Sequence, residues 1–156
     1  MSSAPDAVRL IEVLAAGSWR GPAADQVALD YDGRHRRRVM LAAASGARFL
    51  LDLPQAVHLR HGDGLRATDG RIVEVAALPE PLLEVRAASP ADLLRLAWHL
   101  GNRHLAADIQ EQRILIRRDH VIAHMLEHQG AIVEEVVAVF EPESGAYHGH
   151  AHGHEH

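Results

Sequence analysis

The stretch Trp98-His99-Leu100-Gly101-Asn102-Arg103-His104 decides how the fold of this chain is interpreted. A helical pattern of apolar residues reaches Leu100 and then meets a glycine, the usual residue in the left-handed conformation that ends a helix. We therefore expect the helix to end at Gly101 and the next residues to form a polar corner that contains His104. A lone histidine just past a helix end commonly has no role other than a favourable interaction with the negative end of the helix dipole. A functional role for His104 needs support from the rest of the chain.

The residues around this corner predict alternating strands and helices. Six segments follow one another in the order strand, helix, strand, strand, helix, strand, and we expect them at 82–87, 90–101, 104–109, 113–117, 120–129 and 131–140. Ser89 and Asp119 are suitable N-caps for the two helices. Gly130 is a suitable stop for the second helix. The order is that of a ferredoxin-like βαββαβ domain, with both helices on one face of an antiparallel sheet.

The first half of the chain has a different pattern, in which short apolar runs are separated by turn residues, as in all-β domains. We expect strands at 8–14, 26–29, 38–42, 48–51 and 72–76. The dipeptides Asp32-Gly33 and Asp69-Gly70 are typical hairpin turns, so two hairpins are predicted within a small barrel or sandwich. His35, His58 and His61 lie in or beside predicted turns, and we interpret them as solvated loop residues.

The segment Leu78-Pro79-Glu80-Pro81 separates the two patterns and is the predicted linker. The expected fold class is therefore α+β with two domains: an N-terminal β domain at 1–78 and a ferredoxin-like domain at 79–142. Residues 143–156 form a third region with little apolar content, which we expect to be a disordered histidine-rich tail. Imidazoles are good ligands for nickel, copper and zinc. The tail histidines that alternate with other residues are His148, His150, His152, His154 and His156.

The composition of the 156-residue chain restricts the classes of protein to which it can belong. A hydrophobic fraction of 47% allows a real core. The 16 basic and 21 acidic residues give a formal net charge of -5, which argues against nucleic acid as a partner. The absence of cysteine excludes thiolate ligands, and no apolar run is long enough to span a membrane. We expect a cytoplasmic protein with an unusual total of 13 histidines.

Three of these histidines, His120, His124 and His128, are spaced four apart on the second predicted helix and so form one stripe. Neighbouring imidazoles on such a stripe can chelate a metal. For His124 and His128, simple exposure on the helix surface is the commoner explanation. His120 stands at the start of the helix and could face the same end of the sheet as His104, so we predict that it is an accessory metal ligand.

Several motifs together resemble those of the urease accessory protein E family of nickel metallochaperones. They are the segment 98–104, Asp119-His120-Val121 with Met125-Leu126 and Gly130 downstream, Asp69-Gly70-Arg71, and the histidine-rich tail. The resemblance covers nearly the whole chain. It implies an N-terminal β domain that contacts proteins, a ferredoxin-like metal-binding domain and a homodimer. It also implies delivery of Ni(II) to the urease apoprotein and its maturation complex, which includes an accessory GTPase.

The resemblance also implies roles for individual residues. His104 matches the nickel ligand that family members place at the dimer interface, and the tail histidines match their mobile ligands. His120 matches one histidine of a surface pair that some members carry. The other position of that pair is Arg118 here, which weakens the prediction of a second well-formed site on this helix.

The leading functional hypothesis is a carrier of Ni(II), with Cu(II) and Zn(II) as alternative metals. Catalysis is not expected, because the sequence contains no nucleophile and base at motif spacing and no phosphate-binding glycine loop. Two alternatives stay open: metal storage or detoxification through the tail alone, and a hydrolase that uses a histidine-ligated metal with an open coordination position. A carrier should release its metal to a competing acceptor, whereas a hydrolase should retain it.

Overall fold

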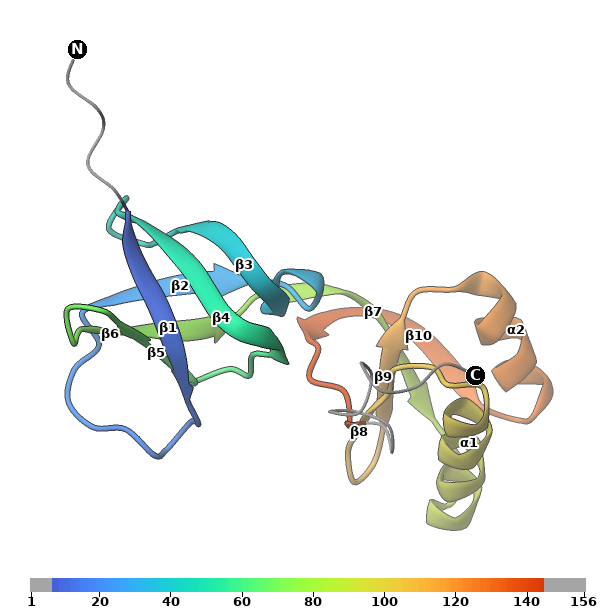
Figure 1. Cartoon of the computed structure of the whole chain (residues 1–156). Coiled ribbons are helices and arrows are strands. Elements are labelled where there is room, and N and C mark those ends of the chain that lie inside the picture. The colour runs from blue at the N-terminus through green and yellow to red at the C-terminus, as the bar shows by residue number, and fades with distance from the viewer. Residues whose placement is uncertain (1–6, 145–156) are drawn as a thin grey trace. The chain divides into compact units, whose positions relative to one another are not determined.

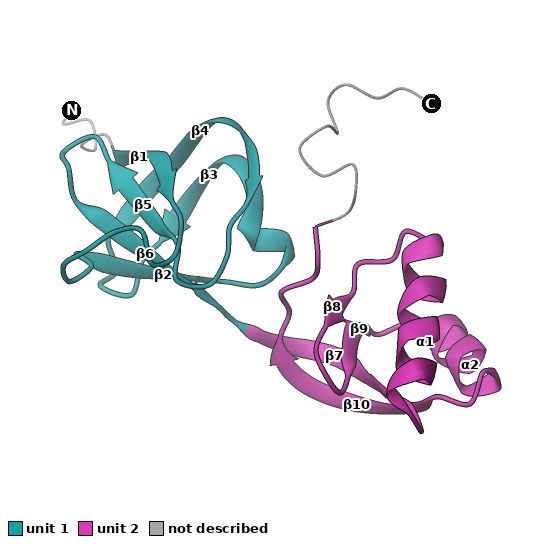
Figure 2. Cartoon of the chain, turned by 90° about the horizontal axis from the view of Figure 1, so that it is seen from below, with its two compact units in different colours: residues 1–78 teal, residues 79–156 magenta. Residues whose placement is uncertain are grey.

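The structure is a computed structural model of the chain and describes residues 7–144 (Figure 1). The chain divides between Leu78 and Pro79 into two compact units, which we call unit 1 and unit 2 (Figure 2). Each unit has its own hydrophobic core. Within residues 7–144 no helix is long and apolar enough to cross a membrane.

Unit 1 is a curled sheet of six strands in the order β2-β6-β5-β1-β4-β3 (Figure 1). Its strands and single 3-10 helix are β1 Val8–Leu14, β2 Asp25–Leu29, η1 Asp32–Arg34, β3 His35–Ala42, β4 Arg48–His58, β5 Gly64–Ala67 and β6 Ile72–Ala77. The β1–β4 and β2–β6 pairs are parallel, and the other pairs are antiparallel. The curl brings the β3–β4 turn to β2, where the Ala44 N–H donates to the Gln26 carbonyl at 2.8 Å.

One of the two predicted hairpins is confirmed and the other is wrong. Asp69-Gly70 joins β5 to β6, which pair in antiparallel register, and Gly70 takes the left-handed conformation that such a turn needs. Asp32-Gly33 instead lies in η1, where the Asp30 carboxylate accepts from the Gly33 N–H at 2.7 Å. This local turn allows β2 to pair with β6 and β3 to pair with β4, so the strands on either side of it are not partners.

Unit 2 contains the order of strands and helices that the sequence predicts. Its elements are β7 Pro79–Arg86, α1 Pro90–Asn102, β8 Asp108–Ile109, β9 Ile114–Arg117, α2 His120–His128 and β10 Ile132–Val139. The strands form an antiparallel sheet in the order β10-β7-β9-β8. The register places Leu83 opposite Ile116 and Val85 opposite Ile114, so these four side chains share one face.

Both helices of unit 2 cover that same face (Figure 2). Leu93, Leu96 and Leu100 of α1 are buried against the strands, and Leu126 of α2 joins the same cluster. Burial of each such side chain stabilises the fold by about 1.5–3 kcal/mol relative to exposure. The core therefore fixes the position of each helix end, including the corner that follows α1.

The predicted linker is wrong in one respect, because Pro79 and Pro81 are residues of strand β7. β10 pairs with β7 along its whole length, but β9 pairs only with the part from Leu82 to Val85. The two prolines therefore lie where β7 is a sheet edge on the β9 side. A strand tolerates proline at such a position because no ladder hydrogen bond is lost.

Candidate metal centre

The first helix of unit 2 begins as the sequence predicts. The Ser89 side chain accepts a hydrogen bond from the Asp92 N–H at 3.1 Å, and Pro90 occupies the first helical position. The helix end differs from the prediction. Gly101 is a helical residue with ordinary φ, and α1 continues to Asn102.

The left-handed residue that follows α1 is His104, with a φ of 58°. Its N–H donates to the Gly101 carbonyl at 3.0 Å. The next N–H, that of Leu105, donates to the Leu100 carbonyl at 3.2 Å. This pair of bonds is a Schellman motif, in which glycine is the usual left-handed residue. His104 therefore occupies the left-handed position that the sequence predicted for Gly101.

His104 is exposed, and among residues 7–144 it is the one non-glycine residue with a positive φ. The left-handed conformation costs a residue with a Cβ roughly 1–2 kcal/mol. Such strained positions are concentrated at functional sites, where the side chain has a use that offsets the cost. The corner therefore presents an accessible imidazole from a backbone that two hydrogen bonds hold in place.

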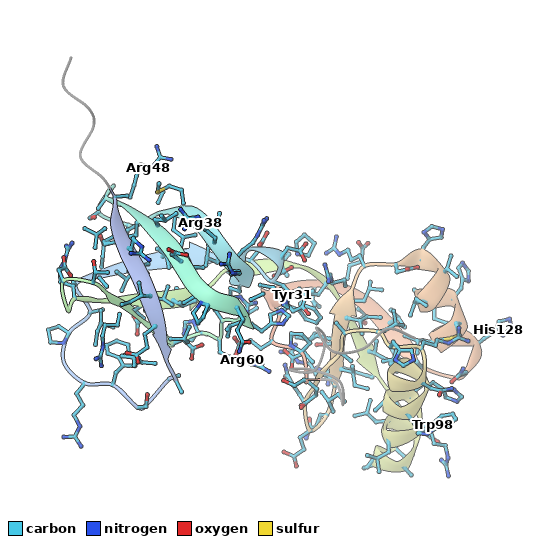
Figure 3. All side chains as sticks on the ribbon, in the orientation of Figure 1. Tyr31, Arg38, Arg48, Arg60, Trp98 and His128 are labelled. Atoms are coloured by element: carbon cyan, nitrogen blue, oxygen red, sulfur yellow. The ribbon has the colours of Figure 1, made fainter. Side chains whose placement is uncertain are left out.

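An exposed apolar stripe runs along α1 towards this corner and consists of Leu94, Trp98 and Gly101. The Leu94 side chain is 72% exposed and the Trp98 side chain is 65% exposed, so neither is packed in the core. Trp98 projects from α1 in Figure 3, and its ring lies edge-on to that of the half-buried His99, with centroids 5.2 Å apart. A Cβ added at Gly101 would meet no atom within 4 Å. The stripe is a surface that a partner can approach closely.

The second helix presents the predicted histidine stripe. Asp119 caps α2 by accepting from the Val121 and Ile122 N–H groups, and His120 is the first helical residue. His120, His124 and His128 are all exposed.

Arg118, which stands two residues before His120, has a structural role. The Arg118 guanidinium donates to the carbonyls of Leu82 and Val136, each at 3.1 Å, and forms an ion pair with Glu135 at 2.9 Å. It therefore ties β7 to β10. A histidine at this position would be too short to make all three contacts.

No complete metal site exists within the described part of one chain. Among residues 7–144, no group of three or more His, Asp or Glu side chains is placed to hold a metal ion. The prediction that His120 faces the same end of the sheet as His104 and acts as an accessory ligand therefore stays a prediction. The five predicted tail ligands, His148 to His156, lie outside the described residues.

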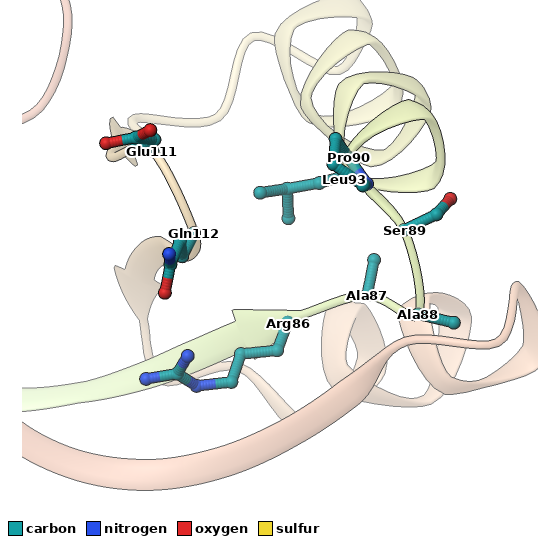
Figure 4. Close-up of a pocket in the computed structure, with 8 residues that line it drawn as sticks. All are labelled: Arg86, Ala87, Ala88, Ser89, Pro90, Leu93, Glu111 and Gln112. Carbon is teal, nitrogen blue, oxygen red and sulfur yellow. The ribbon is translucent and has the colours of Figure 1, made fainter.

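Two other polar features of unit 2 do not extend the site. Figure 4 shows a pocket between the start of α1 and the turn at Glu111 and Gln112, and no histidine lines it. Beside it, the buried Glu84 pairs with Arg86 at 2.6 Å and with Arg113 at 2.8 Å. Hydrogen bonds from Arg86 and then Arg113 hold the pKa of Glu84 below its ordinary value. The Glu84 carboxylate therefore has a structural role in ion pairs with Arg86 and Arg113.

The interpretation of the unit 1 histidines as solvated loop residues is wrong for two of them. His35 begins β3 and His58 ends β4, and their Nδ1 atoms are 2.9 Å apart. His61 is exposed in a turn, but its Nδ1 accepts from the Ala77 N–H at 3.1 Å. Only the register of β3 and β4 brings the first two together, so no local sequence signal could have revealed the pair.

Unit 1 and unit 2, with a strained surface histidine at the end of α1, define the class of this chain as a two-domain α+β protein. Two family models match the chain: the N-terminal domain of UreE urease accessory protein over residues 8–78 and its C-terminal domain over residues 80–156. The chain belongs to the UreE family of urease accessory proteins, as its resemblance to that family predicted.

Curated relatives support this membership along most of the chain. The chain is 59% identical over 133 residues to a urease accessory protein UreE of Chelativorans sp. (strain BNC1), which covers 85% of this chain and 84% of the relative. It is 53% identical over 148 residues to a UreE protein of Bradyrhizobium sp. (strain ORS 278), covering 94% and 70% of the two chains. A UreE protein of Rhodobacter capsulatus is 51% identical over 149 residues, covering 95% and 92%.

Proposed function

We propose that this protein carries Ni(II) and delivers it to the urease maturation complex, with His104 as the central ligand. Membership of the UreE family gives a role in urease maturation; the metal and the route are our proposal. The observation that carries it is the left-handed His104. The protein would be more stable with a glycine at that position. The presence of a histidine there therefore indicates that its imidazole has a function.

One imidazole is too few ligands for a stable nickel site, and we propose that a homodimer supplies the second. A two-fold dimer contacts itself through the same patch on each subunit. If the stripe of Leu94, Trp98 and Gly101 is that patch, the two copies of His104 lie beside the axis. Two ligands then come from one residue, and their fixed backbones reduce the entropy lost on chelation.

Further imidazoles come from the other predicted ligands. The tail histidines are tethered to the same chain as His104, which gives them a high effective concentration at the central pair. His120 is the proposed accessory ligand from α2. A set of ligands that can be added and withdrawn suits a carrier, because it lets the metal leave for a competing acceptor.

The remaining parts of the proposal concern fold, partners and location. The strand order β10-β7-β9-β8, with two helices on one face, supports a ferredoxin-like assignment for unit 2. Unit 1 is proposed to contact the accessory GTPase and the urease apoprotein. We propose that the protein acts with these partners in the cytoplasm.

Nickel titration followed by mass measurement of the intact complex tests this proposal, because it reports the dimer and its metal count together. We expect the full chain to form a dimer with one tight nickel site and additional weaker sites. Removing the residues after Pro142 should lower the total metal count and keep the tight site. His104→Ala should abolish the tight site and leave weak binding. His128→Ala, which changes an exposed helix histidine outside the proposed ligand set, is the matched control.

Two outcomes would contradict the proposal. A first nickel held as tightly by His104→Ala as by the parent would remove His104 from its role. Loss of all nickel binding on removal of the tail alone would favour the alternative of storage through the tail.

A further inference from the structure

The pair of histidines in unit 1 is placed by strand pairing. His35 is the first residue of β3 and His58 is the last residue of β4, and the antiparallel register sets them directly opposite each other. Their ring centroids are 4.2 Å apart and the rings are nearly perpendicular, at 82°. The Nδ1 atoms are separated by 2.9 Å. Two nitrogen donors therefore converge at one end of the β3–β4 ladder.

The surroundings hold this pair in position. The Tyr31 ring lies against the His58 ring with centroids 4.6 Å apart and an interplanar angle of 31°. Directly after His58, the Leu59 N–H donates to the Arg34 carbonyl at 2.8 Å, which ties the end of β4 to the residue before β3. His58 is half-buried and His35 is exposed. One imidazole is thus fixed by packing and the other is open to solvent.

We propose that His35 and His58 form a second metal site, in unit 1, which binds Ni(II) or Cu(II) through both Nδ1 atoms. The 2.9 Å between the Nδ1 atoms is the length of their mutual hydrogen bond. With metal–nitrogen bonds of about 2.0–2.1 Å, two nitrogens held near this separation would subtend an angle of about 90° at a metal ion. Adjacent positions in square-planar and octahedral coordination have that angle, and these geometries suit nickel and copper.

The protonation state of the pair is compatible with coordination. A hydrogen bond between two Nδ1 atoms requires that one ring donates its Nδ1–H and that the other accepts. The accepting ring, if neutral, already carries its proton on Nε2. For the donor, a shift of the proton from Nδ1 to Nε2 frees the second lone pair. No net proton release is needed for this change of tautomer.

The site is open and exchanges its metal. Two protein ligands leave the other coordination positions to water or to ligands from a partner. The Arg34 guanidinium lies 6.0 Å from the Tyr31 ring centroid, and Arg36 follows His35 in β3, so positive charge lowers the affinity for a cation. The site goes beyond the proposed role of unit 1 as a surface for partner proteins and does not require His104.

Cu(II) titration of the full-length, nitrogen-15-labelled protein tests this site, because a paramagnetic ion broadens the amide signals of nearby residues. We expect loss of the signals of residues 34–36 and 57–59 as Cu(II) is added in steps to several equivalents. His35→Asn and His58→Asn should each prevent this loss. His61→Asn is the matched control, because it changes a histidine of the same unit and keeps an acceptor for the Ala77 N–H.

The proposal is overturned if these signals persist in the parent protein, or if they still disappear in both His35→Asn and His58→Asn. If His58→Asn disturbs the fold, the result for His35→Asn alone tests the proposal, because His35 is exposed at the start of its strand. Broadening around His104 is recorded in the same spectra. The same experiment therefore distinguishes failure of the unit 1 site from failure of the proposed nickel centre.

Discussion

The two helices of unit 2 end with the same backbone geometry but with different residues at the decisive position. After α1 the left-handed residue is His104, with a φ of 58°, and after α2 it is Gly130, with a φ of 88°. In both ends this residue donates its N–H three residues back, at 3.0 Å after α1 and 2.9 Å after α2. Glycine is the stable choice for this motif, and of these two helix ends only that of α2 has it.

The hydrophobic contacts of the two ends are also alike. Leu100 and Leu105 flank the first turn, as Leu126 and Ala131 flank the second. Leu100, Leu126 and Ala131 are buried in the core of unit 2, and the half-buried Leu105 packs against it. Each pair is joined by a backbone hydrogen bond, of 3.2 Å in the first and 3.0 Å in the second. Since packing and hydrogen bonding match, they cannot explain why one turn carries a histidine. The difference points to the imidazole, and so to function.

The largest effect is expected from making the first turn like the second. His104→Gly removes the proposed ligand, and we expect the affinity for the first nickel to fall at least 100-fold, or about 2.7 kcal/mol. The same change removes the strain of a Cβ in the left-handed region, so the metal-free protein should gain roughly 1 kcal/mol of stability. For a unit of this size that is a rise in Tm of about 4–8 °C. Calorimetric nickel titration and thermal unfolding measure the two effects on one preparation.

The reciprocal change should separate strain from function. Gly130→His places a histidine in the second turn, where an added Cβ would meet no atom within 4 Å. Any cost therefore comes from the backbone conformation, and we expect a loss of about 1–2 kcal/mol in the free energy of unfolding. Denaturant unfolding measures it, with the tight nickel site as the internal control. An unchanged stability would mean that the first turn carries no strain either.

The other ends of the same helices offer a control for the comparison, because both begin with a side-chain cap. Ser89 accepts one backbone N–H and Asp119 accepts two. We expect Ser89→Ala and Asp119→Ala each to cost about 1 kcal/mol, with the larger loss for Asp119. Chemical denaturation checks this. If one of the two substitutions left the stability unchanged, the helices would differ at both ends. The presence of His104 could then not be treated as the one difference between them.

Much of this architecture follows from local sequence signals. The caps Ser89 and Asp119, the stop at Gly130 and the Asp69-Gly70 turn are each placed by residues close together in the chain. The order of elements in unit 2 was predictable for the same reason. The resemblance to the UreE family rests on motifs of this local kind, and two family models show the membership.

The errors arise where distant contacts outweigh local signals. Gly101 is a good stop by residue type, yet the helix continues because the buried Leu100 and the core contact of Leu105 fix where the chain must turn. Asp32-Gly33 has a hairpin sequence, but its flanking strands find partners elsewhere in the sheet. The pairing of His35 with His58 likewise depends on a register between residues 23 positions apart.

The smallest expected effect tests whether α1 ends where the comparison requires. Gly101 has ordinary helical φ and open space around it, so Gly101→Ala adds a helix-favouring methyl group without a clash. Glycine inside a helix costs roughly 0.5–1 kcal/mol relative to alanine, and we expect the variant to be more stable by about 0.5 kcal/mol because the position is in the last turn. Thermal unfolding of the metal-free protein measures it, at a concentration low enough for the chain to be monomeric, because Gly101 lies in the proposed dimer patch. A loss of stability would instead mean that Gly101 is itself the left-handed stop in solution. His104 would then be unstrained, and the two helix ends would no longer be equivalent.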